Sequence, residues 1–236
     1  MVSDRTGSIL PMFAVVVTVV FMVAAVAVDF ARYALASEKL QTAGDAAATA
    51  ASVTAKRYVR VQIDTGRYWT KCCSMDKDGN KKCRPCCKKC DKGTVIKEGR
   101  EDELIDKKGY KKYCCNCGCG KVRILDRWVE YEKGGAEAAS AAELFFNLNK
   151  PKEMDEENGG DSYIKSIRVV NDRDDPLYPS VIVKTEGRVK TLMMDFMDKI
   201  WGADLSELST TRCSQGGSFY YDFNGKWHRA AEEGCY

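Results

Sequence analysis

The sequence has little of what most catalytic and metal sites require. Only one of its 236 residues is a histidine, His228, so a metal site built from several histidines would lack ligands. There is no CxxCH motif for covalent haem, no GxSxG nucleophile motif and no phosphate-binding P-loop. His228 follows Trp227 and is expected to be a surface or packing residue. The sequence therefore indicates a protein that is not an enzyme and that carries no cofactor or metal.

An excess of one charge is also missing. The 37 Lys and Arg residues face 34 Asp and Glu residues, and a net charge of +3 gives no reason to expect a nucleic-acid partner. With 44% hydrophobic and 30% charged residues, the chain is neither largely disordered nor a membrane protein with many spans. Two features depart from this average. Residues 9–28 carry no charge, and ten of the 12 cysteines lie between Cys72 and Cys119.

The uncharged run predicts a membrane helix. It covers 20 residues, and at about 1.5 Å per residue such a helix spans a hydrocarbon core of about 30 Å. A cleavable signal peptide is the alternative, because Ala25-Val26-Ala27 resembles a cleavage site. The run is longer than the usual apolar region of about 7–15 residues, which favours a retained helix. Residues of this membrane or filament helix singled out from the sequence are Ile9, Phe13, Phe21, Val28 and Asp29.

The helix is expected to continue beyond the apolar run. Residues 29–56 contain no proline and are rich in alanine, the best helix former. One helix of about 50 residues would be about 75 Å long. Small residues recur every three to four positions, at Ala43, Ala47, Ala50 and Ala51, and allow close helix approach. This stripe can lie on the chain's own head or pack against copies of the same helix in an assembly.

The N-terminal region resembles a known family. The motifs that carry the resemblance are Thr6-Gly7-Ser8, an apolar run, Val28-Asp29-Phe30-Ala31-Arg32, Leu40-Gln41-Thr42-Ala43 and Asp45-Ala46-Ala47. Their order and spacing over residues 6–56 are similar to the N-terminal region of TadE/TadG-like proteins of the tight-adherence (Tad) pilus family. The resemblance implies a pilin-like subunit whose partners are copies of itself or other pilin-like subunits, and the membrane before assembly.

Two further points qualify the resemblance. A second stretch resembles a later part of such proteins, where a strand precedes a short amphipathic helix; its residues are Val181-Ile182-Val183, Val189-Lys190-Thr191, Phe196 and Ile200-Trp201-Gly202. Pilin-type subunits of this system are cleaved after a glycine and carry an acidic residue five positions later. Counted from Gly7, that position is Met12, so the cleavage pattern is incomplete.

The remaining chain predicts an α+β head with small antiparallel sheets. Alternation of apolar and polar residues indicates strands over 57–69 and 121–132, which can pair across the cysteine-rich insertion. Further strands are expected over 163–170, 181–189 and 218–224, the last closing at the hairpin signal Asn224-Gly225. The predicted domains are a helix over 1–56 and a head over 57–236, with residues 71–121 as the cysteine-rich insertion.

Two amphipathic helices are expected in the head. The first covers 136–148, with an apolar side formed by Ala139, Leu144, Phe145 and Leu148. The second covers 192–201, with an apolar face formed by Met193, Phe196, Met197 and Ile200. Between them, residues 150–161 form a charged loop.

The insertion needs cross-links to be ordered. Residues 71–121 contain 15 Lys and Arg against 8 Asp and Glu, a net charge of +7, and few large apolar side chains. So polar a segment cannot bury enough apolar surface to offset its chain entropy. Paired CxxC spacings suit zinc or an iron–sulfur cluster, whereas an exported location favours disulfides. We expect disulfides, formed by Cys72, Cys73, Cys83, Cys86, Cys87, Cys90, Cys114, Cys115, Cys117, Cys119, Cys213 and Cys235.

One pairing can be predicted and the others cannot. Cys213 and Cys235 stand apart from the other ten and are expected to bond to each other. Vicinal cysteines bond outward more readily than to each other, but ten cysteines allow too many pairings to choose among.

These features predict a structural protein of the cell surface. We expect a subunit of a Tad-like extracellular filament, or an accessory of its assembly, membrane-anchored by its N-terminal helix before assembly. The alternative is a membrane-tethered metal-binding or redox module. The basic insertion could engage anionic cell-surface material. Asp29 is expected at a subunit or membrane boundary, paired with a cation such as Arg32 or a neighbour's terminal amine.

Overall fold

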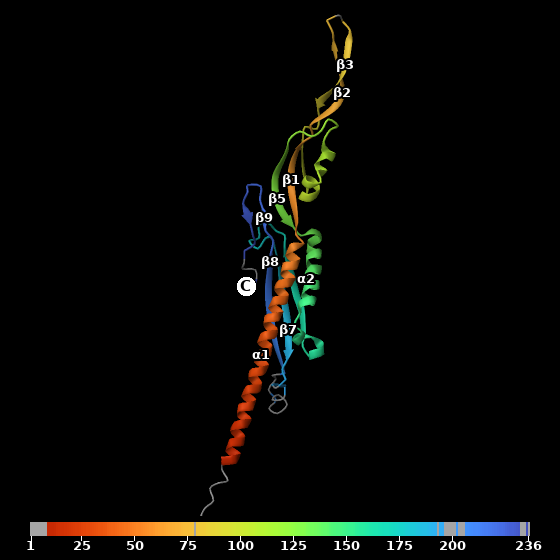
Figure 1. Ribbon diagram of the computed structural model, residues 1–236. Helices are drawn as coiled ribbons and strands as arrows, with labels where there is room; N and C mark the ends of the chain where they lie inside the picture. Colours follow the sequence, from red (N-terminus) through yellow and green to blue (C-terminus); the bar gives the residue numbers. More distant parts are fainter. Residues whose placement is uncertain are drawn as a thin grey trace, which may run out of the picture.

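The molecule is elongated, with a long helix at one end and a disulfide-rich hairpin at the other (Figure 1). The computed structural model describes residues 9–77, 79–192, 194–195, 202, 206–231 and 235, with side chains from residue 11 onward. A long apolar N-terminal helix followed by small antiparallel sheets confirms the predicted α+β class.

Helix α1 covers Ile9–Val53, 45 residues without an internal break. Its sequence explains this length, because no proline follows Pro11 and alanine is frequent throughout. The first half projects from the molecule and is exposed, whereas the second half lies against the head (Figure 1). Helix α1 therefore belongs to the core of the head as much as to the predicted membrane segment.

Ten strands form four antiparallel sheets, with strand orders β4-β1-β5, β2-β3, β6-β7-β8 and β10-β9. The strands are β1 (Lys56–Asp64), β2 (Arg67–Met75), β3 (Lys81–Lys89), β4 (Thr94–Arg100), β5 (Val122–Glu130), β6 (Asp161–Val170), β7 (Ser180–Lys190), β8 (Glu207–Gly217), β9 (Tyr220–Tyr221) and β10 (Trp227–His228). Helix α2 covers Ala136–Asn149, and short helical turns are η2 (Asp102–Asp106), η3 (Gly109–Tyr113), η4 (Glu132–Gly135), η5 (Lys152–Met154) and η6 (Glu156–Asn158).

Strands β1 and β5 pair across the whole cysteine-rich insertion, as the sequence predicted. The register places Tyr58 opposite Trp128, and their rings stack with centroids 5.8 Å apart. Strands β6 and β7 also form where alternation indicated them, with Val169 opposite Val181. Together with α2, these strands lie within a few residues of their predicted bounds.

Three predictions about strands need correction. The single strand expected over 57–69 is two strands, because the chain turns at Gly66, whose φ of 77° is a conformation glycine adopts readily. The strand expected over 218–224 is shorter, and β9 pairs with β10 across the Asn224-Gly225 turn. Strand β8 was not predicted. The helix expected over 192–201 lies largely outside the described residues.

The main core lies between α1, α2 and the β6–β7–β8 sheet. Its buried residues are Ala36, Leu40, Ala43, Ala47, Ala48, Ala51, Tyr131, Ala138, Ala142, Phe146, Met154, Val181, Val183 and Val189. Small residues let the helix lie directly on the strands: a Cβ on Gly216 of β8 would stand 2.0 Å from the Ala48 carbonyl oxygen of α1. The small-residue stripe of α1 therefore packs on the chain's own head.

Helix α2 buries a different face from the predicted one. Leu144, Phe145 and Leu148 were expected to face the core, but they are 58%, 44% and 70% exposed. The buried face consists of Ala138, Ala142 and Phe146. Close packing against the alanine-rich α1 explains the difference, because small side chains allow the two helices to approach.

Side chains join the upper sheet to the lower one. The Tyr178 hydroxyl accepts a hydrogen bond from Val129 N (2.9 Å) and donates to the Val129 carbonyl oxygen. In the same way, Asn171 accepts from Tyr131 N (2.9 Å) and donates to the Tyr131 carbonyl oxygen (3.1 Å). Burial raises the pKa of Tyr178 to about 12. These contacts fix the end of β5 against the segment between β6 and β7.

Candidate assembly and binding surfaces

The first half of α1 presents a continuous apolar surface. Phe13, Phe21 and Val28 are 67%, 70% and 55% exposed, whereas only the backbone of Ile9 is described. Helix α1 is long and apolar enough to cross a membrane, and none of its most apolar 18-residue window is buried. An apolar surface of this length is stable only when lipid or protein covers it.

Asp29 lies where the exposed half of α1 ends. It is 2% exposed, and its carboxylate accepts hydrogen bonds from Leu192 N (3.1 Å) and Met194 N (3.0 Å). Arg32 Nη1 lies 3.9 Å from Asp29 Oδ1. A carboxylate that accepts two backbone N–H groups is well compensated for burial. Its main partners are thus backbone amides that follow β7, which the sequence analysis did not identify; a neighbour's terminal amine is not required.

At the far end, two disulfides cross-link the β2–β3 hairpin. The structure joins Cys72 to Cys86 and Cys73 to Cys83, so neither member of the vicinal pair bonds to the other. Cys73 and Cys83 are direct partners in the strand register. No residue of β2 or β3 is buried, so these cross-links replace a hydrophobic core in the hairpin.

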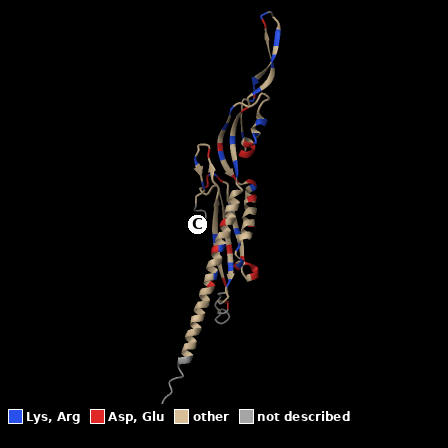
Figure 2. Cartoon of the chain, in the orientation of Figure 1, with Lys and Arg blue, Asp and Glu red and all other residues tan. Residues whose placement is uncertain are grey.

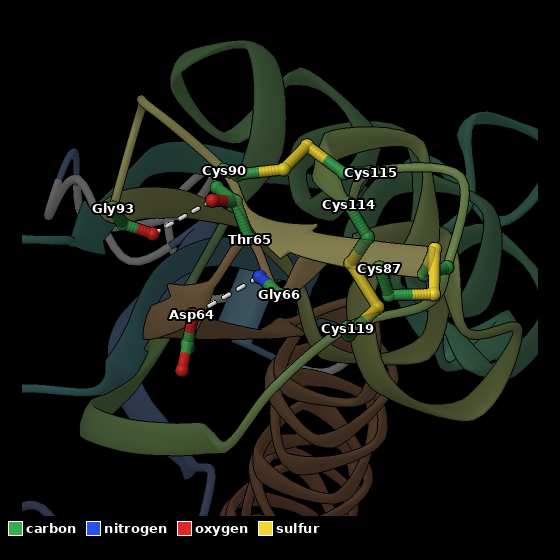
Figure 3. The surroundings of a disulfide bond; sticks show 10 residues. Asp64, Thr65, Gly66, Cys87, Cys90, Gly93, Cys114, Cys115 and Cys119 are labelled. Atoms are coloured by element: carbon green, nitrogen blue, oxygen red, sulfur yellow. Dashed lines mark hydrogen bonds between the residues drawn. A yellow bond between two sulfur atoms is a disulfide. The ribbon is translucent and has the colours of Figure 1, made fainter. Parts of the chain in front are cut away.

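Three more disulfides fasten the loop of residues 114–119 to the base of this hairpin (Figure 3). They join Cys87 to Cys117, Cys90 to Cys115 and Cys114 to Cys119. Backbone hydrogen bonds add to them, because Cys115 N donates to the Thr65 carbonyl oxygen (2.9 Å) and Cys117 N to that of Arg67 (2.9 Å). The sixth disulfide joins Cys213 of β8 to Cys235, the pairing chosen from the sequence.

Turn residues hold the base of the hairpin in place. The Thr65 hydroxyl donates to the Gly93 carbonyl oxygen (2.8 Å), and Asp64 Oδ1 accepts from Gly66 N (3.0 Å), as Figure 3 shows. A Cβ on Gly66 would stand 1.9 Å from the Gly118 carbonyl oxygen, so only glycine fits between the strand and the loop. The cysteine-rich loop therefore lies directly on the hairpin.

The hairpin is strongly basic (Figure 2). Residues 67–92 contain nine Lys and Arg against three Asp, a net charge of +6. Lys82 Nζ lies 2.8 Å from Asp76 Oδ2 and lowers the pKa of that carboxyl. The other described basic residues of the hairpin form no ion pair within 4.0 Å, which leaves a positive surface open to an anionic partner.

A metal centre in the cysteine cluster is not favoured. Each of the twelve cysteines lies in one of the six disulfides, so no thiolate is left as a ligand in this state. Within the described part of the chain, no group of three or more His, Cys, Asp or Glu side chains is placed to hold a metal ion. His228 lies 2.9 Å from Asp222 and stacks on Tyr220, as expected for a packing residue.

Comparison with protein families gives one match. Residues 7–55 match the Tad family described as putative Flp pilus-assembly TadE/G-like. The N-terminal segment is Tad-like. The match covers about a fifth of the chain and ends where α1 ends, so the second stretch of resemblance, around 181–202, lies outside it. No curated protein and no solved structure matches the chain.

The Tad-like segment includes both halves of α1. Its apolar half is the exposed surface, and its alanine-rich half is the part built into the head. Proteins of this family are associated with pili and are typically structural rather than catalytic. The chain is thus consistent with a pilus-associated subunit, whose head beyond residue 55 is described by its own geometry alone.

Proposed function

We propose that the protein is a structural subunit, or an assembly accessory, of a Tad-like extracellular filament. Residues 11–28 hold it in the membrane before assembly and later contact other pilin-like subunits. The head, with its disulfide-linked tip, lies on the outer surface. Here the tip means residues 67–121.

The exposed half of α1 is the observation that carries this proposal. Its apolar surface begins next to the N-terminus and ends at Asp29, beyond which the same helix enters the core of the head. Lipid can cover this surface before assembly, and helices of other subunits can cover it afterwards. The stiff continuation into the head fixes the direction in which the head projects from such a helix bundle.

The outer face of α2 supports lateral contact between subunits. Leu144, Phe145 and Leu148 form an exposed apolar stripe on the side of α2 turned away from the core. Exposed stripes of this kind are typical of protein contacts. A filament subunit needs such surfaces beside its helix, whereas a solitary tethered module does not.

An experiment on one helix position tests the proposal. Phe21→Lys places a charge near the centre of the apolar segment, which costs roughly 2.5–3.5 kcal/mol on membrane-insertion scales. Leu35→Lys adds the same charge to the same helix beyond Asp29, at a residue that is 58% exposed. Material sheared from cells is imaged by negative-stain microscopy, and the chain is quantified in it by mass spectrometry.

We expect the wild-type chain and Leu35→Lys in the sheared filaments, and Phe21→Lys in neither the filaments nor the membrane fraction. Absence of the wild-type chain from sheared filaments would refute a filament subunit. Normal incorporation of Phe21→Lys would show that the apolar segment is not the assembly surface.

A further inference from the structure

A basic groove lies on one side of the tip, beside the hairpin base. It has a volume of about 670 Å³ and is lined by four chain segments. Three lysines and two tyrosines supply its polar chemistry: Tyr68, Lys92, Lys97, Lys112 and Tyr113. Asp91 is the one carboxylate among the lining residues.

Two of the lysines are held over one ring. Lys97 Nζ lies 5.1 Å from the centroid of the Tyr113 ring, and Lys112 Nζ lies 5.2 Å from the same centroid. The ring attracts both ammonium groups, but the two positive charges repel each other. Neither lysine forms an ion pair within 4.0 Å in the described chain. An anion placed between them would relieve the repulsion.

Disulfides fix the geometry of the groove before any ligand arrives. Cys90–Cys115 joins the segment that carries Lys92 to the segment that follows Tyr113, and Cys114–Cys119 closes the adjoining loop. The groove therefore differs from a set of surface lysines, because its chain segments are covalently held together. A preorganised site loses less entropy when it binds.

We propose that this groove binds an acidic polysaccharide, with carboxylates on Lys97 and Lys112. The groove contains lysines but no arginine, and arginine is the residue that matches phosphate with two parallel hydrogen bonds. The Tyr113 ring is covered by ammonium groups, so it offers no free face on which a nucleic-acid base could stack. The basic hairpin continues from the groove, which suits a polymer with repeated charges (Figure 2).

The proposal names a partner for the outer surface and rests on the proposed function only in placing the tip outside the cell. Binding and assembly can fail separately. A groove variant that enters sheared filaments normally but does not bind polysaccharide retains the assembly function. A chain absent from filaments could still bind through the same groove in purified form.

The test uses the full oxidised chain in detergent with polygalacturonate as the probe, at about 0.15 M salt, where surface charges are screened beyond about 8 Å. Lys97→Gln/Lys112→Gln removes both groove charges. The matched control, Lys81→Gln/Lys88→Gln, removes the same charge from exposed positions of β3 outside the groove. We expect the groove variant to weaken binding about tenfold or more, which corresponds to about 1.4 kcal/mol, and the control about threefold or less.

Reduction gives a second readout that charge alone cannot produce. Reducing the disulfides leaves every lysine in place, so binding through net charge would persist, whereas binding in the groove is expected to fall as much as in Lys97→Gln/Lys112→Gln. Equal losses in the two double variants, or unchanged binding after reduction, would overturn the groove.

Two further probes test the ligand class. Neutral dextran of similar length is expected not to bind, and duplex or single-stranded DNA is expected to bind more weakly than polygalacturonate. Dextran binding, DNA binding as tight as polygalacturonate binding, or no polygalacturonate binding would each overturn the proposal.

Discussion

The two ends of the head are held together by different means. The body, which comprises residues 36–53 of α1, helix α2 and the β6–β7–β8 sheet, buries alanine, leucine, valine and phenylalanine side chains around one core. The tip contains five of the six disulfides, and its buried residues in the described chain are Cys90 and Leu104. One region is ordered by apolar burial and the other by covalent cross-links.

This difference shows what each region can tolerate. An isolated two-stranded hairpin is at best marginally stable in water, so β2 and β3 need their cross-links to persist. In exchange, nearly every surface position of the hairpin is free to be lysine or arginine, because none must enter a core. The body has the opposite constraint, since a change of volume in its core disturbs the packing of α1.

The largest effect is expected from a single aromatic residue in the body. Phe146→Ala removes a side chain that is 2% exposed, and such truncations cost about 3–5 kcal/mol. Its neighbour Phe145 is 44% exposed, so Phe145→Ala is expected to cost less than about 1 kcal/mol. Urea unfolding of both variants in detergent measures the difference. Equal costs would mean that the buried face of α2 has been assigned wrongly.

A pair of adjacent glycines tests the closeness of α1 to the sheet. A Cβ on Gly216 would meet the Ala48 carbonyl oxygen at 2.0 Å, whereas a Cβ on Gly217 would meet only the Ala230 Cβ, at 3.7 Å. Gly216→Ala is therefore expected to destabilise the chain by about 3 kcal/mol, and Gly217→Ala by less than about 0.5 kcal/mol. Thermal unfolding would contradict this packing if the two variants melted at the same temperature.

Removing one disulfide from each region separates local from global effects. Cys213→Ser/Cys235→Ser opens a bond with a sequence separation of 22 on strand β8 of the body, and we expect a loss of about 3 kcal/mol in global stability. Cys73→Ser/Cys83→Ser opens a bond in the hairpin, where the expected loss of about 2–3 kcal/mol concerns the hairpin alone. Limited proteolysis within residues 67–92 should increase only in the second variant. A lowered global unfolding midpoint in that variant would contradict the separation.

The joint between the regions gives the smallest effect. Tyr178→Phe removes both hydrogen bonds to Val129, and we expect a cost of about 1–2 kcal/mol. Exposed Tyr221→Phe is the control. Because burial raises the pKa of Tyr178 from 10.0 to about 12, its contribution is complete below pH 10 and is lost as the pH rises through 12. Wild-type stability should therefore decline more steeply over this range than that of Tyr178→Phe; parallel curves would argue against the buried phenol.

The sequence predicted the elements whose pattern is local. The apolar run, the alanine-rich continuation of α1, and the alternating strands β1, β5, β6 and β7 all follow from residue order. The face of α2 could not be read in this way, because α1 offers alanines as a packing surface and selects the small residues of α2. Strand β8 was missed since its polar sequence shows little alternation.

Long-range features of the candidate surfaces also escaped the sequence. The partners of Asp29 lie more than 160 positions away, so no local pattern relates them. The groove lysines come from separate segments that disulfides bring together, and the cysteine spacing alone allows many pairings. The charge of the hairpin, by contrast, was evident from composition.

Hydrogen exchange of the full chain, read by mass spectrometry with and without a reductant, tests most directly whether cross-links order the tip and burial orders the body. After reduction we expect amides of the β2–β3 hairpin and of residues 107–120 to lose protection, while those of 36–52 and 180–190 keep theirs. Protection retained throughout the reduced tip, or lost equally in the body, would contradict the account.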